Sequence, residues 1–259
     1  SSWFFNFNFY NLMRLLVSCE SPENQEKALR LAEELELTYL PYKGEDKKKY
    51  IDSYFFIYQP NSSYIRKGLG TPTKEIRCNF THRSNSFSDP LLSKCLKGLP
   101  NKFNALDLTA GFGKDALEIA KHQNCSSVLL LEKEKWLCYL LREGINNVED
   151  IKALGKLKKF AIKNIDNKDY LNKNTNHYDL IYIDPMFSGV GKSKAKKALQ
   201  ALRELTQISD TKGLLDLSIK KASKRVVVKR HKKTKYLDGI KPNYSVTGKV
   251  VRYDIYNSI

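Results

Sequence analysis

The N-terminal part of the chain has two short apolar runs with one amphipathic segment between them. The runs Leu12–Val17 and Tyr54–Tyr58 predict strands, because they are continuous and rich in residues that favour extended structure. Between them, apolar residues recur at helical spacing and predict a helix over Pro22–Leu37, with Ser21 as its N-cap. The segment Ser62–Pro90 is rich in Ser, Asn, Thr, Pro and Gly, and it predicts a boundary between two domains.

After this boundary the pattern changes to strands that alternate with helices. Apolar runs predict strands at Asn104–Leu108, Ser127–Leu131, Phe160–Ile165, Asp179–Ile183, Arg225–Val228 and Val250–Tyr256. Helical spacing predicts helices at Leu91–Leu96, Gly113–His122, Trp136–Ile145 and Lys194–Ile208. Such alternation predicts an α/β fold with a doubly wound, mostly parallel sheet, in which ligands bind outside the carboxyl ends of the strands. We therefore expect a small N-terminal α/β unit at residues 1–80 and a Rossmann-like domain at residues 81–259.

The charge of the chain is concentrated near its C-terminus. The net charge is +17, and 18 of the 45 Lys and Arg residues, against five of the 28 Asp and Glu residues, follow Asp184. A field of this kind attracts polyanions, chiefly nucleic acid, although a merely solvated Lys-rich surface is the alternative.

The cysteines and the apolar runs exclude several classes of protein. The five cysteines form no CxxC pair, and no histidine stands at zinc-finger spacing, so we expect reduced thiols, a cytoplasmic protein and no metal site. No apolar run approaches the roughly 18 residues that a membrane span needs, so we expect no membrane association.

The first motif that carries chemistry is the segment Asp107–Asp115 (DLTAGFGKD), which follows a predicted strand and opens a predicted helix. Gly111 and Gly113 allow a tight turn and close approach of a ligand to the backbone. The spacing also matches a loose dinucleotide fingerprint, and a purely structural turn is a further alternative. The acid Asp107 precedes the glycines, and this order is typical of methyltransferases, in which the carboxylate faces the ammonium of S-adenosylmethionine.

The second motif is Glu132, at the end of the next predicted strand. An acid at this position accepts hydrogen bonds from ribose hydroxyls in nicotinamide and S-adenosylmethionine enzymes alike. Taken alone, it could equally be a solvated side chain of the Glu132–Lys135 run (EKEK).

The third motif, Asp184-Pro185-Met186-Phe187, ends the strand Asp179–Ile183 and varies the Asp-Pro-Pro-Tyr/Phe signature of amino-methyltransferases. An exocyclic amine is a poor nucleophile because its lone pair is delocalised into the ring. The Asp184 carboxylate and the Pro185 carbonyl would accept its hydrogens and turn the lone pair toward the methyl donor, while Phe187 would stack on the base. A strand that merely ends at a proline turn is the alternative.

Two further patterns are rejected. Gly189–Ser193 (GVGKS) is similar to part of a phosphate-binding loop, but Met186 stands where that loop needs glycine. The four histidines are scattered without nucleophile partners, so hydrolase chemistry has no support.

With these motifs in place, the chain resembles the small-subunit ribosomal RNA guanine-N2 methyltransferase J family. The resemblance covers roughly residues 82–259 in the family's order and spacing. It rests on Asp107–Ala120 (DLTAGFGKDALEIA), Leu130–Glu134 (LLEKE), Tyr182–Phe187 (YIDPMF), Lys224–Arg230 (KRVVVKR) and Arg252–Tyr256 (RYDIY).

The resemblance implies an enzyme that uses S-adenosylmethionine, without a metal, to methylate guanine N2 in RNA of the small ribosomal subunit. It places cofactor contacts at Lys114, Asp115, Glu132, Lys133, Asp166, Asn167 and Asp184, beside the Asp107, Gly111 and Gly113 of the first motif. We expect RNA phosphates to be held by basic residues near the third motif and the following strand, namely Lys192, Lys194, Lys196, Lys197, Lys229 and Arg230. The alternatives are a DNA adenine or cytosine amino-methyltransferase, a non-catalytic RNA-binding assembly factor on the same scaffold, and an NAD-dependent dehydrogenase.

Overall fold

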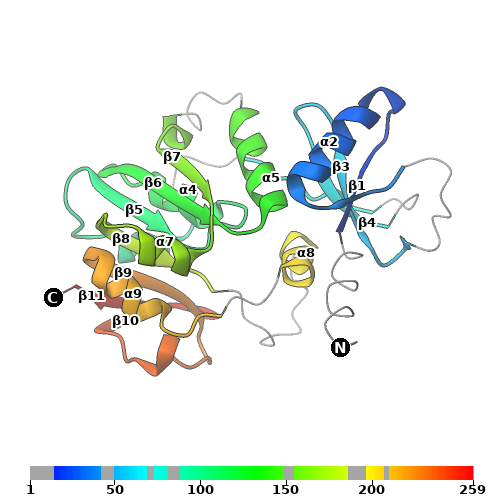
Figure 1. Ribbon diagram of the computed structural model, residues 1–259. Coiled ribbons are helices and arrows are strands. Elements are labelled where there is room, and N and C mark those ends of the chain that lie inside the picture. Colours follow the sequence, from blue (N-terminus) through cyan, green and yellow to red (C-terminus); the bar gives the residue numbers. More distant parts are fainter. Residues whose placement is uncertain are drawn as a thin grey trace. The chain divides into compact units, whose positions relative to one another are not determined.

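The computed structural model describes residues 15–41, 50–68, 73–80, 88–148, 155–185, 197–206 and 210–258 (Figure 1). The chain forms two compact units, and neither is one continuous stretch. The first consists of residues 1–79, 142–147 and 194–206, and the second of residues 80–141, 148–193 and 207–259. The predicted division at residue 80 stays a prediction.

The first unit contains a four-stranded sheet in the order β2-β1-β3-β4. Strands β1 (Leu15–Cys19), β2 (Thr38–Tyr39) and β3 (Tyr54–Tyr58) are parallel, and β4 (Tyr64–Lys67) runs antiparallel to β3.

Helix α2 (Gln25–Leu35) packs on β1 and buries its apolar stripe, Ala28, Leu31, Ala32 and Leu35. The prediction that Ser21 caps it is wrong. A 3-10 turn, η1 (Pro22–Asn24), lies between them, and the Ser21 side chain makes no capping hydrogen bond.

The second unit is built on a seven-stranded sheet in the order β10-β11-β9-β8-β5-β6-β7. The pairs from β9 to β7 are all parallel, and β11 is antiparallel to both of its neighbours. The strands are β5 (Phe103–Asp107), β6 (Cys125–Glu132), β7 (Phe160–Asn164), β8 (Tyr178–Ile183), β9 (Ala222–His231), β10 (Tyr244–Thr247) and β11 (Val251–Asn257).

Helices cover both faces of this sheet. Successive strand residues point to opposite sides, so they pack against the helices of one face or the other. Ile181, Ile183 and Val226 face a core cluster with helices α7 (Asn167–Lys173) and α9 (Leu214–Lys221). Residues of the opposite parity, such as Tyr182 and Tyr253, face α4 (Lys114–Ala120) and the start of α3 (Pro90–Cys95), since their hydroxyls donate to Asp115 and Asp89. The predicted doubly wound, mostly parallel sheet is therefore confirmed.

Two predicted helices need comment. Helix α5 (Lys135–Asn146) forms where it was expected. Helix α8 (Lys197–Leu205) also forms, but it clusters with the first unit, where its Glu204 accepts a hydrogen bond from Tyr54 at 2.8 Å. The helix that packs on β8 and β9 is α9 instead. No helix among the described residues is long and apolar enough to cross a membrane.

Candidate active site

Three acidic residues lie at the carboxyl ends of neighbouring parallel strands. Asp107 ends β5, Glu132 ends β6, and Asp184 directly follows β8. Because β5 lies between β6 and β8, and Asp107 is in register with Leu130 and Tyr182, the three acids share one edge of the sheet. The chain order reverses between β5 and β8, and ligands of doubly wound sheets bind at such a switch point.

The loop after β5 brings backbone to this edge. Gly111 and Gly113 have φ values of 52° and 66°, a region that glycine adopts without strain. A Cβ on Gly113 would lie 2.9 Å from Leu141 Cδ1 and 3.1 Å from Phe80 Cζ, so the loop packs closely as well. Helix α4 begins at the next residue, Lys114, so its N-terminus lies at the same edge of the sheet.

Asp107 is a buried carboxylate, with 1% of its surface exposed. Its Oδ1 accepts hydrogen bonds from the Thr109 backbone N–H at 2.9 Å and from the Thr109 hydroxyl at 3.4 Å. Burial raises its pKa to about 8, and the nearby Asp115 and Asp184 add to the rise. Within the part of the chain that the structure describes, no lysine or arginine side chain forms an ion pair with Asp107. A bound cation would lower this pKa.

Glu132 is also buried, with 8% of its surface exposed, which argues against a solvated surface residue. Its Oε2 accepts the Gly111 N–H at 3.0 Å and its Oε1 accepts the Glu134 N–H at 2.9 Å. These bonds orient the carboxylate and join it to the glycine loop, while burial raises its pKa to about 7. Each oxygen keeps a further lone pair for a ligand hydroxyl.

Asp184 lies in a network of charged side chains. Lys229 Nζ, on β9, is 3.1 Å from Asp184 Oδ2 and 2.7 Å from Asp115 Oδ2, in the first turn of α4. Burial raises the pKa of Asp184 to about 6, while Lys229 opposes the rise and Asp115 adds to it.

Two residues of this network were missed by the sequence analysis. The Tyr182 hydroxyl donates to Asp115 Oδ2 at 2.7 Å. The Thr109 hydroxyl accepts the Asp184 N–H at 2.7 Å, so it connects the third motif to the first. Both belong to quoted motifs, but their roles depend on which face of the sheet each side chain takes.

The remaining predicted cofactor residues lie at the same edge. Asp166 caps α7 by accepting the N–H groups of Lys168 at 2.8 Å and Asp169 at 3.3 Å. Asn167 donates to the Leu108 carbonyl at 3.3 Å. Lys114 and Lys133 border α4 and β6, and all four contacts to cofactor stay predictions.

The predicted RNA-binding residues separate into groups. Lys192, Lys194 and Lys196 lie outside the described residues, as does the side chain of Lys197. Phe187, predicted to stack on the base, also lies outside them. Arg230 is 8% exposed and donates to the Lys235 carbonyl at 2.6 Å. Lys229 is bound to two carboxylates, so the structure gives its predicted phosphate contact no support.

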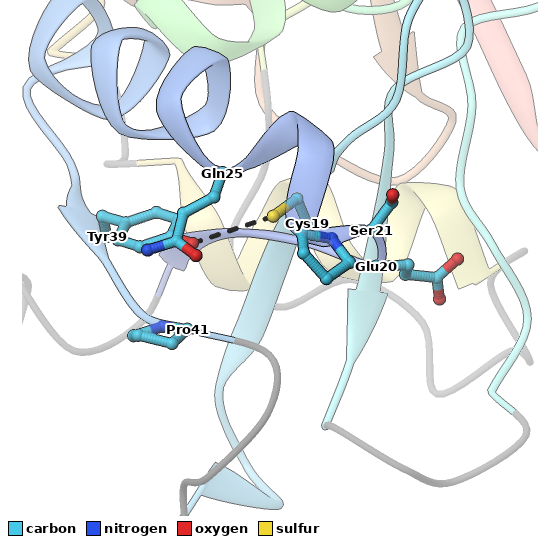
Figure 2. A pocket seen from close by; sticks show the side chains of 7 residues that line it. Cys19, Glu20, Ser21, Gln25, Tyr39 and Pro41 are labelled. Atoms are coloured by element: carbon cyan, nitrogen blue, oxygen red, sulfur yellow. Dashed lines mark hydrogen bonds between the residues drawn. The ribbon is translucent and has the colours of Figure 1, made fainter.

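A pocket lies in the first unit, at the carboxyl end of β1 (Figure 2). It has a volume of about 90 Å³, and its lining includes Cys19 and Tyr39, whose Sγ and hydroxyl oxygen are 3.7 Å apart. Its carboxylate, Glu20, already pairs with Arg66 at 3.2 Å. None of the predicted site residues lines it. Among the described residues, no group of three His, Cys, Asp or Glu side chains is placed to hold a metal ion.

Comparisons with known proteins bear on this site. A family model described as "Putative SAM-dependent methyltransferase" matches residues 77–258. The ribosomal RNA small subunit methyltransferase J of Francisella philomiragia is 34% identical over 162 residues, which are 61% of this chain and 67% of that protein. The protein of the same name from Coxiella burnetii is 38% identical over 153 residues, which are 58% of this chain and 59% of that protein.

The chain therefore spans 59% to 67% of the length of these two relatives. A crystal structure of a SAM-dependent methyltransferase from Neisseria gonorrhoeae has the same fold, with a TM-score of 0.64 and 21% identity. That match covers 93% of this chain and 95% of the other.

Proposed function

Because the chain belongs to the ribosomal RNA small subunit methyltransferase J family of S-adenosylmethionine-dependent enzymes, we propose that it methylates the exocyclic N2 of a guanine in small-subunit ribosomal RNA. The observation that carries this proposal is the position of Asp184. It directly follows β8, beside two buried acids that suit the cofactor. The reaction would take place in the cytoplasm, where small ribosomal subunits are found.

The residues at the carboxyl edge fit the cofactor. S-adenosylmethionine supplies an electrophilic methyl group on a sulfonium, and it also carries an ammonium and a ribose. Asp107 would bind the ammonium, because it is a buried carboxylate with a raised pKa and no cationic partner among the described side chains. Glu132, oriented by two backbone N–H groups, would accept the ribose hydroxyls. Lys114, Asp115, Lys133, Asp166 and Asn167 would complete the site.

Asp184 and Pro185 would orient the substrate amine. The Asp184 carboxylate and the Pro185 carbonyl would accept the two hydrogens of the amine, so that the nitrogen lone pair leaves conjugation and points at the methyl group. The hydrogen bond from the Asp184 N–H to Thr109 holds this segment against the loop that carries Asp107. Phe187 would stack on the guanine. After transfer, the methylated, cationic amine is acidic enough to lose its proton to water.

The basic side chains would hold RNA by its phosphates. Lys232, Lys233 and Lys235 are exposed in the turn that follows β9, at the same edge of the sheet as Asp184. Lys192, Lys194, Lys196 and Lys197 would add to them from the segment after the third motif. Such contacts position RNA without reading its sequence.

The test is methyl transfer to small ribosomal subunits that lack the native modification, with the product nucleoside identified by mass. Asp184→Asn and Asp184→Ala should each reduce turnover by about 10²–10³ at saturating S-adenosylmethionine, because a preorganised contact at developing charge is lost. The control is Asp216→Asn, since Asp216 lies on α9 with 62% of its side chain exposed.

Three results would contradict the proposal. Near-normal saturated turnover by Asp184→Ala would exclude the orienting role. A methylated adenine or cytosine as product would exclude guanine as the substrate, and binding of NAD without binding of S-adenosylmethionine would exclude the cofactor.

A further inference from the structure

The Lys229 ammonium joins two carboxylates that come from different elements. It lies 2.7 Å from Asp115 Oδ2 and 3.1 Å from Asp184 Oδ2, and its side chain is 23% exposed. The side chains of Asp115 and Asp184 are 20% and 36% exposed. Asp115 also receives the Tyr182 hydroxyl at 2.7 Å, so the network connects α4, β8 and β9.

The position of Lys229 follows from strand register. Val228 pairs with Ile183 across the parallel ladder, so the next residues, Lys229 and Asp184, meet where β8 ends. Lys229 has the parity of Val227 and Tyr182, which places its side chain on the face covered by α4. A lysine at this position cannot turn to solvent without leaving both carboxylates.

We propose that Lys229 is a positioning residue, whose ammonium keeps Asp184 ionised and holds its carboxylate beside the first turn of α4. This inference rests on the proposed function, in which Asp184 must accept hydrogens from the substrate amine. A protonated carboxyl group presents a donor and loses acceptor capacity, so an Asp184 that gained a proton would orient the amine poorly. Lys229 thereby connects the cofactor loop to the residue that orients the substrate.

The surroundings of Asp184 explain why a cation is needed there. Although 36% of the Asp184 side chain is exposed, its partial burial and the like charge of Asp115 raise its pKa to about 6, and Lys229 acts in the opposite direction. The two carboxylates in turn raise the pKa of Lys229, although its burial opposes this, so the ammonium stays charged throughout the neutral range. Among the described residues, the titratable and charged groups that interact electrostatically with Asp184 include Lys229, Asp115, Asp107, Tyr182, Tyr253 and Arg230.

The competing role for Lys229 is a direct contact to an RNA phosphate. The two roles differ in what they predict. A phosphate contact raises the KM for RNA and contributes to the salt dependence of binding. A positioning role changes the titration of Asp184 and the pH dependence of turnover, and it leaves the KM for RNA nearly unchanged.

The first experiment measures the Asp184 titration in the cofactor-free protein. Aspartate carboxyl carbons are labelled with ¹³C, and the Asp184 signal is assigned by its absence in Asp184→Asn. In Lys229→Met the Asp184 pKa should rise by about one to three units, because an adjacent cation lowers an aspartate pKa by that amount. Lys224→Met is the matched control, since Lys224 is exposed on the same strand. An Asp184 pKa that is the same in Lys229→Met and the wild type overturns the proposal.

The second experiment measures turnover against pH at saturating S-adenosylmethionine. Lys229→Met should lose about tenfold or more at pH 7 and recover at higher pH, where Asp184 ionises without help. Lys229→Arg keeps the charge and should retain the wild-type pH profile with an intermediate kcat, and circular dichroism checks that each variant is folded. An unchanged kcat with a raised KM for RNA assigns Lys229 to phosphate binding and overturns the proposal.

These measurements separate the inference from the function on which it rests. If the wild-type protein transfers no methyl group to small subunits, the proposed function is wrong, and the carboxyl titration still decides whether Lys229 keeps Asp184 ionised. If the wild type is active and the Asp184 pKa is the same in Lys229→Met as in the wild type, the inference is wrong and the proposed function stands.

Discussion

Asp107 gives the cofactor-free protein a pH dependence of stability. Its pKa rises from the ordinary aspartate value of 3.8 to about 8 in the folded protein, mainly because it is buried. The folded state therefore holds a proton that the unfolded state releases, and the free energy of unfolding falls as pH increases between these values. Glu132, at about 7, and Asp184, at about 6, change stability in the same direction.

We expect cofactor-free protein to resist urea better at pH 6 than at pH 8.5, and Asp107→Asn to show a smaller difference because its amide does not titrate. Equilibrium unfolding followed by circular dichroism at both pH values measures this. S-adenosylmethionine should also reduce the difference, since a bound cation stabilises the ionised Asp107. Equal pH dependence of the wild type and Asp107→Asn would show that Asp107 is not protonated in the fold.

At the scale of residues, the sequence predicted the acids better than their partners. Asp107, Glu132 and Asp184 could be placed because each follows a recognisable apolar run, and the ends of parallel strands meet at one edge. The pairing of Lys229 with Asp115 and Asp184 could not be predicted in the same way. It depends on the register between β8 and β9 and on the side of the sheet that α4 covers, and neither leaves a local pattern.

At the scale of elements, the turn before α4 places two separate demands on one residue. Gly113 has a φ of 66°, and a Cβ added to it would lie too close to its neighbours, at 2.9 Å from Leu141 and 3.1 Å from Phe80. Gly213 stands in the corresponding place before α9, with a φ of 75° and no atom within 4 Å of an added Cβ. The two glycines therefore share the backbone strain and differ in packing.

Gly113→Ala should lower the free energy of unfolding by about 2–4 kcal/mol, because left-handed backbone strain and overpacking add. Gly213→Ala should cost about 1 kcal/mol, from backbone strain alone. Urea denaturation of the two variants beside the wild type measures the difference. Equal losses would mean that Leu141 and Phe80 move aside without cost.

The elements themselves were predictable where periodicity is strong and ambiguous where segments are short. The buried strands β5, β6, β8 and β9 follow continuous apolar runs, and all four were predicted. Helices α7 and α9 and strands β4 and β10 were missed, because each is short and mixes polar and apolar residues. Helix α8 was predicted, but amphipathic spacing does not specify which unit a helix joins.

At the scale of the whole molecule, the charge excess should act through the exposed lysines at the carboxyl edge. Changing Lys232, Lys233 and Lys235 together to Gln should lower the slope of log affinity against log salt by about 2 units for RNA, since each phosphate contact contributes about 0.7 to 0.9. The measurement is binding to small-subunit RNA at several salt concentrations.

The matched control changes three exposed lysines at the opposite edge of the same sheet. Lys102 precedes β5, Lys173 ends α7 and Lys220 lies in the last turn of α9, so all three are near the beginnings of the parallel strands. Their replacement by Gln removes the same charge and should leave the slope nearly unchanged. Equal slopes for both triple variants would mean that the lysines after β9 are solvated surface residues without an RNA-binding role.

The central strands do not pair in the order in which they follow one another along the chain, and this affects how the chain folds during its synthesis. Among the strands of the seven-stranded sheet, a ribosome synthesises β5, β6 and β7 first. These strands can already pair with one another while they carry Asp107 and Glu132. Strand β8 then joins β5, but its other edge has no neighbour until β9 has been synthesised. An unpaired central strand is a template for aggregation. A nascent chain that stalls before β9 therefore has both cofactor acids, an exposed apolar edge and an Asp184 without Lys229.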